Sequence, residues 1–195
     1  MRKIQNRDLL EKKGKRNQMM VGFILILLMI MSVVGYGLMS GSRTSGSTNE
    51  KIEYNGYEFE KQGGLWYFEI EGQKFVTSYT PQETQEIAIA EISLEEYSGK
   101  PVYYVTNGSK GVNELMTNIV RYFQRTQEVC LKGEECRGDF VEKDCNSSII
   151  IFKTDEEFEN INIYRQNNCL FIESKPEKII KASDRVVFKL LDIQE

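Results

Sequence analysis

The sequence predicts a small α+β, or mixed α/β, domain that follows one N-terminal transmembrane helix. Three observations predict it: one long apolar stretch near the N-terminus, a series of aromatic and β-branched runs separated by turn residues, and two later segments with apolar residues at helical spacing. The chain of 195 residues has room for one ordinary domain besides an anchor and a linker. We therefore expect a mixed sheet with two main helices on one face.

A basic segment, residues 1–18, precedes the predicted transmembrane helix, residues 19–40. Residues 1–16 carry seven basic and two acidic side chains, whereas residues 19–40 carry no charge. As a helix, residues 19–40 would span ~33 Å, enough for a hydrocarbon core of ~30 Å. Because basic flanks stay in the cytoplasm, we expect a single-pass signal-anchor in the cell membrane. Its N-terminus would be cytoplasmic and the domain behind it extracytoplasmic.

Three other interpretations of the apolar stretch stay open. A buried core helix would usually show a polar face, and none is present between Val21 and Met31. A cleaved signal peptide has a shorter apolar region and a small-residue cleavage site. A pilin-type leader would place a basic-glycine cleavage site directly before the apolar helix, but residues 15–18 intervene after Gly14.

A flexible linker, residues 41–50, leads to the folded domain, residues 51–195. The linker is predicted from its small polar residues without periodicity. Strand signals then run from residue 51 to residue 79. Two aromatic runs, residues 65–70 and 73–77, are joined across Glu71-Gly72 and predict a β-hairpin.

The middle of the domain alternates strand and helix signals. Thr80-Pro81 with Glu83 predicts a short helix with proline at its first position. Alternation over residues 87–92 predicts a half-buried strand, and residues 101–105 predict another. Ser109 is expected to cap an amphipathic helix. The apolar positions of this helix are Val112, Leu115, Met116, Ile119, Val120 and Phe123.

The C-terminal part predicts three strands and a terminal helix. The strands are centred on residues 149–152, 161–164 and 170–172. Ser174 and Glu177 have the spacing of a capping box, which predicts the start of the helix. Its apolar stripe consists of Ile179, Ile180, Val186, Val187, Leu190 and Leu191.

Four cysteines lie in the part of the chain that is expected outside: Cys130, Cys136, Cys145 and Cys169. An even number in an exported small domain predicts disulfides, with three connectivities open for two bonds. Pairing across the short loop around Gly133 would join the first two cysteines and leave the other two for each other, and we prefer this pairing. A zinc site or a thioredoxin-like redox pair would need closely spaced cysteines such as C-x2-C, which are absent.

Charge and composition exclude several classes of function. The chain contains no histidine, so serine–histidine and cysteine–histidine catalysis are excluded. Of 25 basic and 29 acidic residues, residues 1–43 hold eight and two, so residues 44–195 carry a formal charge of −10. Such an acidic surface repels phosphate backbones, and we expect no nucleic-acid partner. The acidic clusters lack the spacing of a calcium loop. No catalytic residue, metal or cofactor is predicted.

Two tripeptides match the acceptor pattern for N-glycosylation. Asn107 and Asn146 each stand two residues before a serine, and both fall at predicted turns. We treat them as candidate modification sites.

The order of several motifs resembles that of small uncharacterised membrane-anchored proteins of archaeal genomes. These motifs are the N-terminal anchor, Asn55-Gly56-Tyr57, a helix ending in Cys130, two further cysteines, and Asn168-Cys169 before a terminal Lys-Ala-Ser-Asp-Arg helix. The resemblance covers residues 50–191 and implies no activity.

Two functions follow as expectations. In the first, residues 19–40 contact the lipid bilayer and the outer domain binds a protein or envelope partner, or serves envelope assembly. In the second, the protein is a membrane-tethered hydrolase that uses carboxylates. A deep cleft with carboxyl groups of raised pKa would favour the hydrolase. An acidic face with an exposed apolar patch would favour binding.

Overall fold

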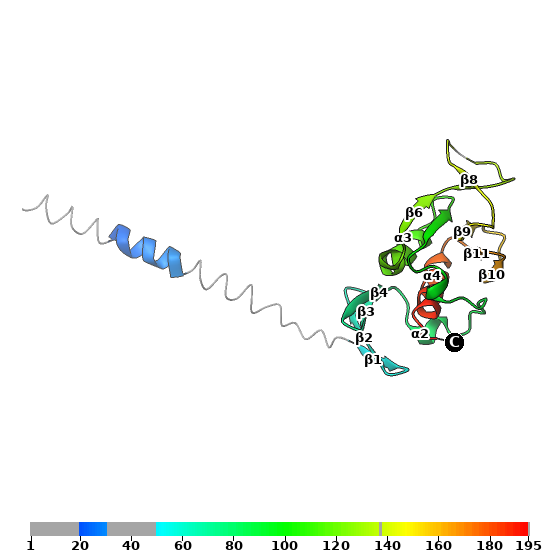
Figure 1. Ribbon diagram of the computed structural model, residues 1–195. Helices are drawn as coiled ribbons and strands as arrows, with labels where there is room; N and C mark the ends of the chain where they lie inside the picture. The colour runs from blue at the N-terminus through cyan, green and yellow to red at the C-terminus, as the bar shows by residue number, and fades with distance from the viewer. Residues whose placement is uncertain (1–19, 31–49, 137, 195) are drawn as a thin grey trace, which may run out of the picture. The chain divides into compact units, whose positions relative to one another are not determined.

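The computed structural model describes residues 20–30, 50–136 and 138–194, and the chain divides into two units, residues 1–48 and 49–195. In the first unit, residues 20–30 form a helix (Figure 1) whose large apolar side chains are 49% to 74% exposed. Within the described ranges, no helix has both the length and the apolar character needed to cross a bilayer. The predicted basic segment, half of the predicted transmembrane helix and nearly all of the predicted linker lie outside these ranges.

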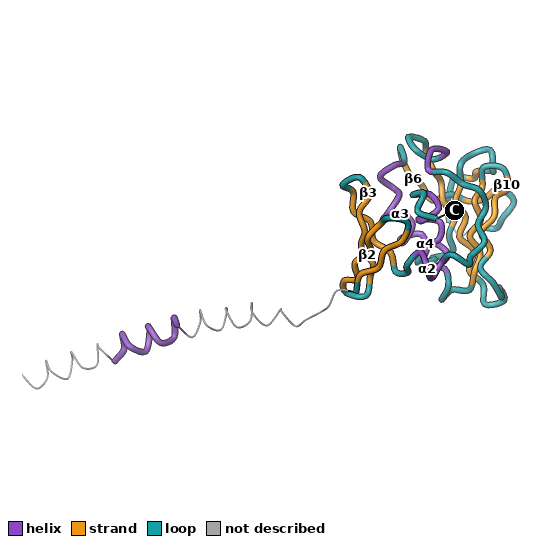
Figure 2. Tube along the Cα trace, turned by 90° about the horizontal axis from the view of Figure 1, so that it is seen from below, coloured by secondary structure: helices purple, strands orange, loops and turns teal. Residues whose placement is uncertain are grey.

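The second unit is an α+β domain in which helices lie between two sheets (Figure 2). The α+β class is therefore confirmed. The expectation of one sheet with helices on one face is wrong, because the first four strands form a sheet of their own on the opposite side of the helices. The two helices consequently bury apolar side chains on both sides.

The first sheet is an antiparallel meander in the order β1-β2-β3-β4. Its turns Asn55-Gly56 and Glu71-Gly72 have positive φ at both residues, which is the geometry of tight two-residue hairpins. The predicted hairpin is confirmed. The strands are β1 (Lys51–Tyr54), β2 (Tyr57–Gln62), β3 (Leu65–Ile70) and β4 (Gln73–Thr77).

The second sheet is mixed, in the order β10-β11-β9-β5-β6. The strands β11, β9, β5 and β6 are parallel, and β10 pairs antiparallel with β11. The first four residues of both β9 and β11 are buried, as expected for parallel strands covered on two faces. The strands are β5 (Pro101–Val105), β6 (Arg125–Glu128), β9 (Ile149–Thr154), β10 (Asn162–Gln166) and β11 (Cys169–Ser174).

The helices begin and end partly where the sequence predicts. The capping box of Thr80 and Glu83 opens α2, as expected. Ser174 instead ends β11, and the terminal helix begins later, without a side-chain cap on its first turn. Ser109 accepts a hydrogen bond from the backbone N–H of Gly111 at 3.2 Å, one residue before the N-cap position. The helices are α2 (Pro81–Thr84), α3 (Gly111–Ile119) and α4 (Ile179–Leu190), with 3₁₀ turns η1 (Leu94–Glu96) and η2 (Val120–Tyr122).

The predicted strand over residues 87–92 is not formed. The segment makes one isolated bridge, Ile89 to Ile163, and the backbone N–H of Ala90 donates to the Ile163 carbonyl at 3.1 Å. Ile92 is buried, and Ile87 and Ile89 pack against the same core. The alternation in the sequence thus arises because these three isoleucines pack on the core, while the irregular segment runs beside β10 without forming a strand.

The main core lies between the two sheets and surrounds α3 and α4. Its centre on the side of the first sheet is aromatic: the ring of Phe68 lies 4.6 Å from that of Phe59, 5.3 Å from that of Phe75 and 6.0 Å from that of Phe188 on α4. On the other side, α4 packs on β11. The helices therefore join the two sheets into one hydrophobic core.

The α4 side chains pack so tightly on Gly111 of α3 that no space is left for a Cβ. A Cβ at this position would lie 2.6 Å from Ser183 Oγ and 2.8 Å from Ile179 Cγ1. We expect Gly111→Ala to lower the free energy of unfolding by ~1–3 kcal/mol through overpacking, although alanine has the higher helix propensity. Urea unfolding of the full chain, followed by fluorescence of the single buried Trp66, measures the change. A control is Asn113→Ala on the exposed side of α3. A Gly111→Ala protein as stable as the parent would contradict the prediction.

Candidate functional site

A cleft of about 670 Å³ lies at one edge of the second sheet. The parallel strands β5, β6 and β9 all end there, with Val105, Glu128 and Thr154 as their last residues. The carboxyl ends of parallel strands are the usual place for ligand sites in such sheets. The remaining lining residues are Thr106, Asn107, Val129, Glu134, Glu135, Cys136, Phe140, Phe152, Lys153, Asp155 and Phe158.

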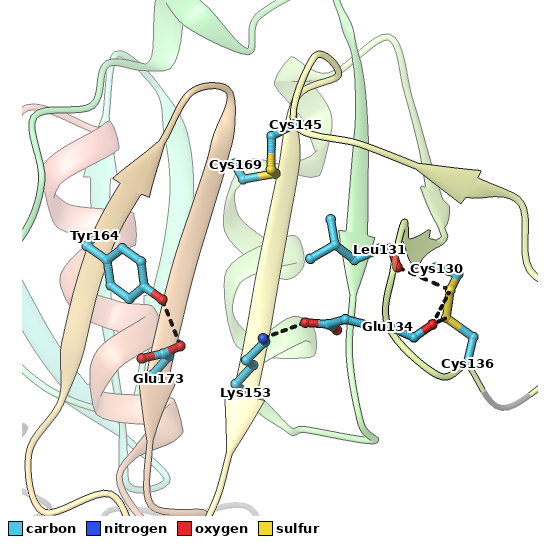
Figure 3. A network of polar contacts seen from close by, with 9 residues as sticks. All are labelled: Cys130, Leu131, Glu134, Cys136, Cys145, Lys153, Tyr164, Cys169 and Glu173. Carbon is cyan, nitrogen blue, oxygen red and sulfur yellow. Dashed lines mark hydrogen bonds and ion pairs between the residues drawn. A yellow bond between two sulfur atoms is a disulfide. The ribbon is translucent and has the colours of Figure 1, made fainter.

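A disulfide-closed loop contributes part of the cleft wall. Cys130 is buried and forms a disulfide with the exposed Cys136. The loop between them turns at Gly133, whose φ is positive, and it presents Glu134 and Glu135 to the cleft. Figure 3 shows this loop beside the ends of the strands. Two short paired strands flank the loop and its continuation: β7 (Cys130–Leu131) and β8 (Glu142–Lys143).

The second disulfide, between Cys145 and Cys169, joins the segment that follows β8 to the start of β11. Both bonds have the pairing that the spacing favoured, so this prediction is confirmed. Cys145 and Leu131 pack on a second apolar cluster, on the face of the sheet that α3 and α4 do not cover. The segment from β7 to β9 therefore covers part of this face of the sheet through Leu131 and Cys145, and this packing holds the cleft wall in place. The buried members of this cluster are Tyr103, Val129, Ile149, Ile151, Cys169 and Phe171.

Two hydrogen bonds at the cleft join the segment after β5 to the end of β9. Asn107 Nδ2 donates to the carbonyl of Thr154 at 3.2 Å, and Thr154 Oγ1 donates to Asn107 Oδ1 at 3.0 Å. Both polar atoms of the Asn107 side chain are thus engaged. Asn146 lies at an exposed turn, where its backbone carbonyl accepts from Asn168 Nδ2 at 3.1 Å. Of the two candidate glycosylation sites, Asn146 is therefore the one whose side chain stands clear of the cleft.

The cleft is acidic and partly apolar. Four carboxylates line it, and Lys153 is the single basic side chain among its lining residues. Lys153 Nζ lies 2.6 Å from Glu134 Oε1 (Figure 3), so this lysine neutralises one of the four. Phe140 is 42% exposed and Phe158 is half-buried. The site therefore offers separate negative charges beside aromatic surface.

The carboxylates do not converge on one point. Across the described residues, no three His, Cys, Asp or Glu side chains are close enough to hold a metal ion. A compact ion would need several oxygen ligands at ~2.0–2.6 Å. The arrangement suits a ligand that extends along the cleft.

Two further carboxyl groups, on α3 and α4, are not among the residues that line the cleft. Asp184 on α4 is completely buried, and its Oδ2 accepts from the backbone N–H groups of Ser78 at 3.0 Å and Tyr79 at 2.9 Å. Glu114 on α3 accepts from Ser78 Oγ at 2.9 Å. Burial, and then repulsion by the nearby Glu114, raise the pKa of Asp184 well above its ordinary value of 3.8. The two carboxyl groups hold the chain where it leaves β4.

Sequence reasoning did not identify the cleft, although part of the signal is present. Thr106-Asn107 directly follows β5, and Thr154-Asp155 stands at the end of β9, a pattern that can mark a site at the edge of a parallel sheet. The strand β6 has the sequence Arg-Thr-Gln-Glu and no apolar alternation. Its pairing with β5, which brings Glu128 to the cleft, could not be predicted from it.

Comparison of the chain with models of protein families, with curated proteins and with solved structures finds no match. The function is therefore inferred from the cleft, the disulfides and the distribution of charge.

Proposed function

We propose that this chain is a single-pass membrane protein whose extracytoplasmic domain binds a protein or envelope partner. The observation that carries the proposal is the pairing of all four cysteines in two disulfides. Disulfides of this kind persist in oxidising compartments and are rare in the cytosol. An oxidising location requires export of the domain, and residues 19–40 offer the means.

The anchor is supported by the apolar character of its described part. The helix of residues 20–30 presents large apolar side chains on all sides, with Phe23 and Met29 the most exposed. An apolar surface around a whole helix is stable only in lipid or inside a protein. The basic residues before it would keep the N-terminus in the cytoplasm. The resemblance to membrane-anchored archaeal proteins is consistent with this arrangement.

Binding is favoured over catalysis by where the carboxyl groups lie. Asp184 has a strongly raised pKa but is completely buried, so no substrate can reach it. The cleft, in contrast, combines exposed carboxylates with aromatic surface, which suits recognition of a partner.

Thiol labelling of intact cells tests the location of the domain. We expect a membrane-impermeant maleimide to label none of the four cysteines before reduction. After reduction, the exposed Cys136 should be labelled first and the fully buried Cys169 last. Mass spectrometry of the peptides measures each site.

A matched control places a thiol in the basic segment. The cysteine of a Gln5→Cys variant should stay unlabelled in intact cells and react after permeabilisation, because it lies on the cytoplasmic side. Labelling of the native cysteines in permeabilised cells without reductant would show reduced thiols on the cytosolic side and overturn the proposal.

A further inference from the structure

We propose that the cleft at the ends of β5, β6 and β9 binds a basic peptide segment, an extended stretch with lysine or arginine next to apolar residues. The inference rests on the proposed binding function and names the chemical class of the ligand. It is carried by three properties of the cleft: carboxylates without a cationic partner among the described residues, aromatic surface beside them, and carboxylates that come from three separate segments.

Three of the four carboxylates are available to a ligand. The side chains of Glu128 and Glu135 make no hydrogen bond or ion pair with any described residue. Asp155 accepts one hydrogen bond, from the backbone N–H of Glu157 at 2.9 Å. Among the residues that the structure describes, Glu134 alone of the four has a cationic partner, Lys153. The cleft therefore keeps an excess of negative charge, which a cationic ligand would neutralise.

The apolar residues that line the cleft favour lysine and arginine side chains over small inorganic cations. Phe140 and Phe158 line the cleft together with Val105 and Phe152. Lysine and arginine carry apolar stems behind their charged ends, so they can contact aromatic surface and a carboxylate at once. An arginine guanidinium can in addition stack on an exposed ring. A small hydrated inorganic cation could not use this surface.

The shape of the site favours a peptide segment over a single ion or one isolated amine. The cleft volume of about 670 Å³ lies within the range of ~300–1,000 Å³ that is usual for ligand pockets. Its carboxylates come from the end of β6, from the disulfide loop and from the segment after β9, and no three of them meet at a metal-binding distance. A chain with two basic side chains can reach carboxylates on more than one of these walls.

The disulfide loop makes the site pre-organised. Glu134 and Glu135 lie within the ring closed by Cys130 and Cys136, and Lys153 on β9 holds Glu134 at 2.6 Å. A wall that is ordered before binding lowers the entropy cost of association. This order explains why a short exposed loop can contribute to recognition.

Fluorescence anisotropy of the full-length protein in detergent micelles tests the proposal. The probe is a fluorescein-labelled peptide, Ala-Leu-Lys-Phe-Arg-Leu-Ala, and its partner has glutamine in place of lysine and arginine. We expect the basic peptide to bind more tightly than the neutral one, with an affinity that falls as salt rises. The Glu128→Gln/Glu135→Gln double variant should bind it about tenfold more weakly, because charge-assisted hydrogen bonds are lost.

The matched control removes the same amount of charge from residues that do not line the cleft. Glu156 and Glu159 lie close to the cleft in sequence but do not line it, and the Glu156→Gln/Glu159→Gln variant should bind within about twofold of the parent at ~0.15 M salt because neither side chain can form a direct charge-assisted hydrogen bond with a ligand in the cleft. Equal binding of the two peptides, no binding to the parent protein, or an equal loss in both double variants would each overturn the proposal. These outcomes leave the proposed location and anchoring untouched, since those depend on the labelling of cysteines.

Discussion

Replacing Asn118 by alanine is expected to lower the free energy of unfolding by ~2–4 kcal/mol. Asn118 on α3 is 1% exposed, and its amide pairs with the edge strand β4. Its Oδ1 accepts from the Val76 N–H at 2.9 Å, and its Nδ2 donates to the Val76 carbonyl at 2.7 Å and to the Glu114 carbonyl at 3.0 Å. The side chain thus bonds β4 as a neighbouring strand would. Alanine would leave the part-buried N–H and carbonyl of Val76 without their protein partner.

Two further variants distinguish the loss of the Asn118 hydrogen bonds to β4 from a general change in the stability of α3. Asn118→Asp keeps the shape and the acceptor but loses the donor and adds a buried charge, so it should be at least as destabilising at neutral pH. Asn113→Ala, on the exposed side of the same helix, should change stability by less than ~0.5 kcal/mol. Urea unfolding followed by Trp66 fluorescence measures all three proteins. An Asn118→Ala protein within that margin of the parent would show that solvent or repacking satisfies Val76.

The stability advantage of Asp184→Asn over the parent protein is expected to grow as the pH rises. Burial and the neighbouring Glu114 raise the pKa of Asp184 in the folded protein, whereas the unfolded chain has the ordinary value. Above the ordinary pKa, the folded protein therefore holds a proton that the unfolded chain has released. The contribution of this group to stability is full below pH ~4 and is lost as the pH rises toward the raised pKa, by up to ~1.4 kcal/mol per pH unit.

Asparagine should remove this pH dependence and preserve the local structure. It is neutral at every pH, and its Oδ1 can still accept from the backbone N–H groups of Ser78 and Tyr79. Asp184→Ala also lacks the titrating group but has no acceptor, so it should be ~2–4 kcal/mol less stable than Asp184→Asn across the pH range. Asp139→Asn, at an exposed position, controls for the change in net charge. Unfolding curves measured from pH 4 to pH 8 provide the comparison, and a constant difference between Asp184→Asn and the parent would contradict the expected titration.

Local signals in the sequence were sufficient for the tight turns, most of the strands and the cysteine pairs. Asn55, Gly56 and Gly72 adopt the positive φ that their hairpins require because glycine and asparagine tolerate this conformation. Glu71 takes the same conformation because the two-residue turn demands it. The capping box of Thr80 and Glu83 forms within one helical turn. Disulfide pairing followed from the short loop between Cys130 and Cys136, since close sequence spacing already brings these thiols together.

Elements that form only by pairing with a distant segment were not predicted correctly from the local sequence. Residues 87–92 alternate like a strand but form one bridge, to Ile163. The polar strand β6 is formed because β5 supplies a partner edge, and Ser174 ends β11 because its backbone continues the pairing with β9. The candidate site likewise combines local and distant features. The cysteines and Asn107 were identified from local motifs, whereas the carboxylates of the cleft were not.

The sequence by itself determined the apolar stretch at residues 19–40, the tight turns, the amphipathic stripes of α3 and α4, and the preference for the pair Cys130–Cys136. Each depends on residues that are close along the chain or share a helical period. Only the tertiary structure decided that the helices lie between two sheets, that Asn118 covers β4, and that Glu128, Glu135 and Asp155 line one cleft. These features require contacts between segments far apart in sequence, and the free energy of such contacts depends on packing that no local pattern encodes.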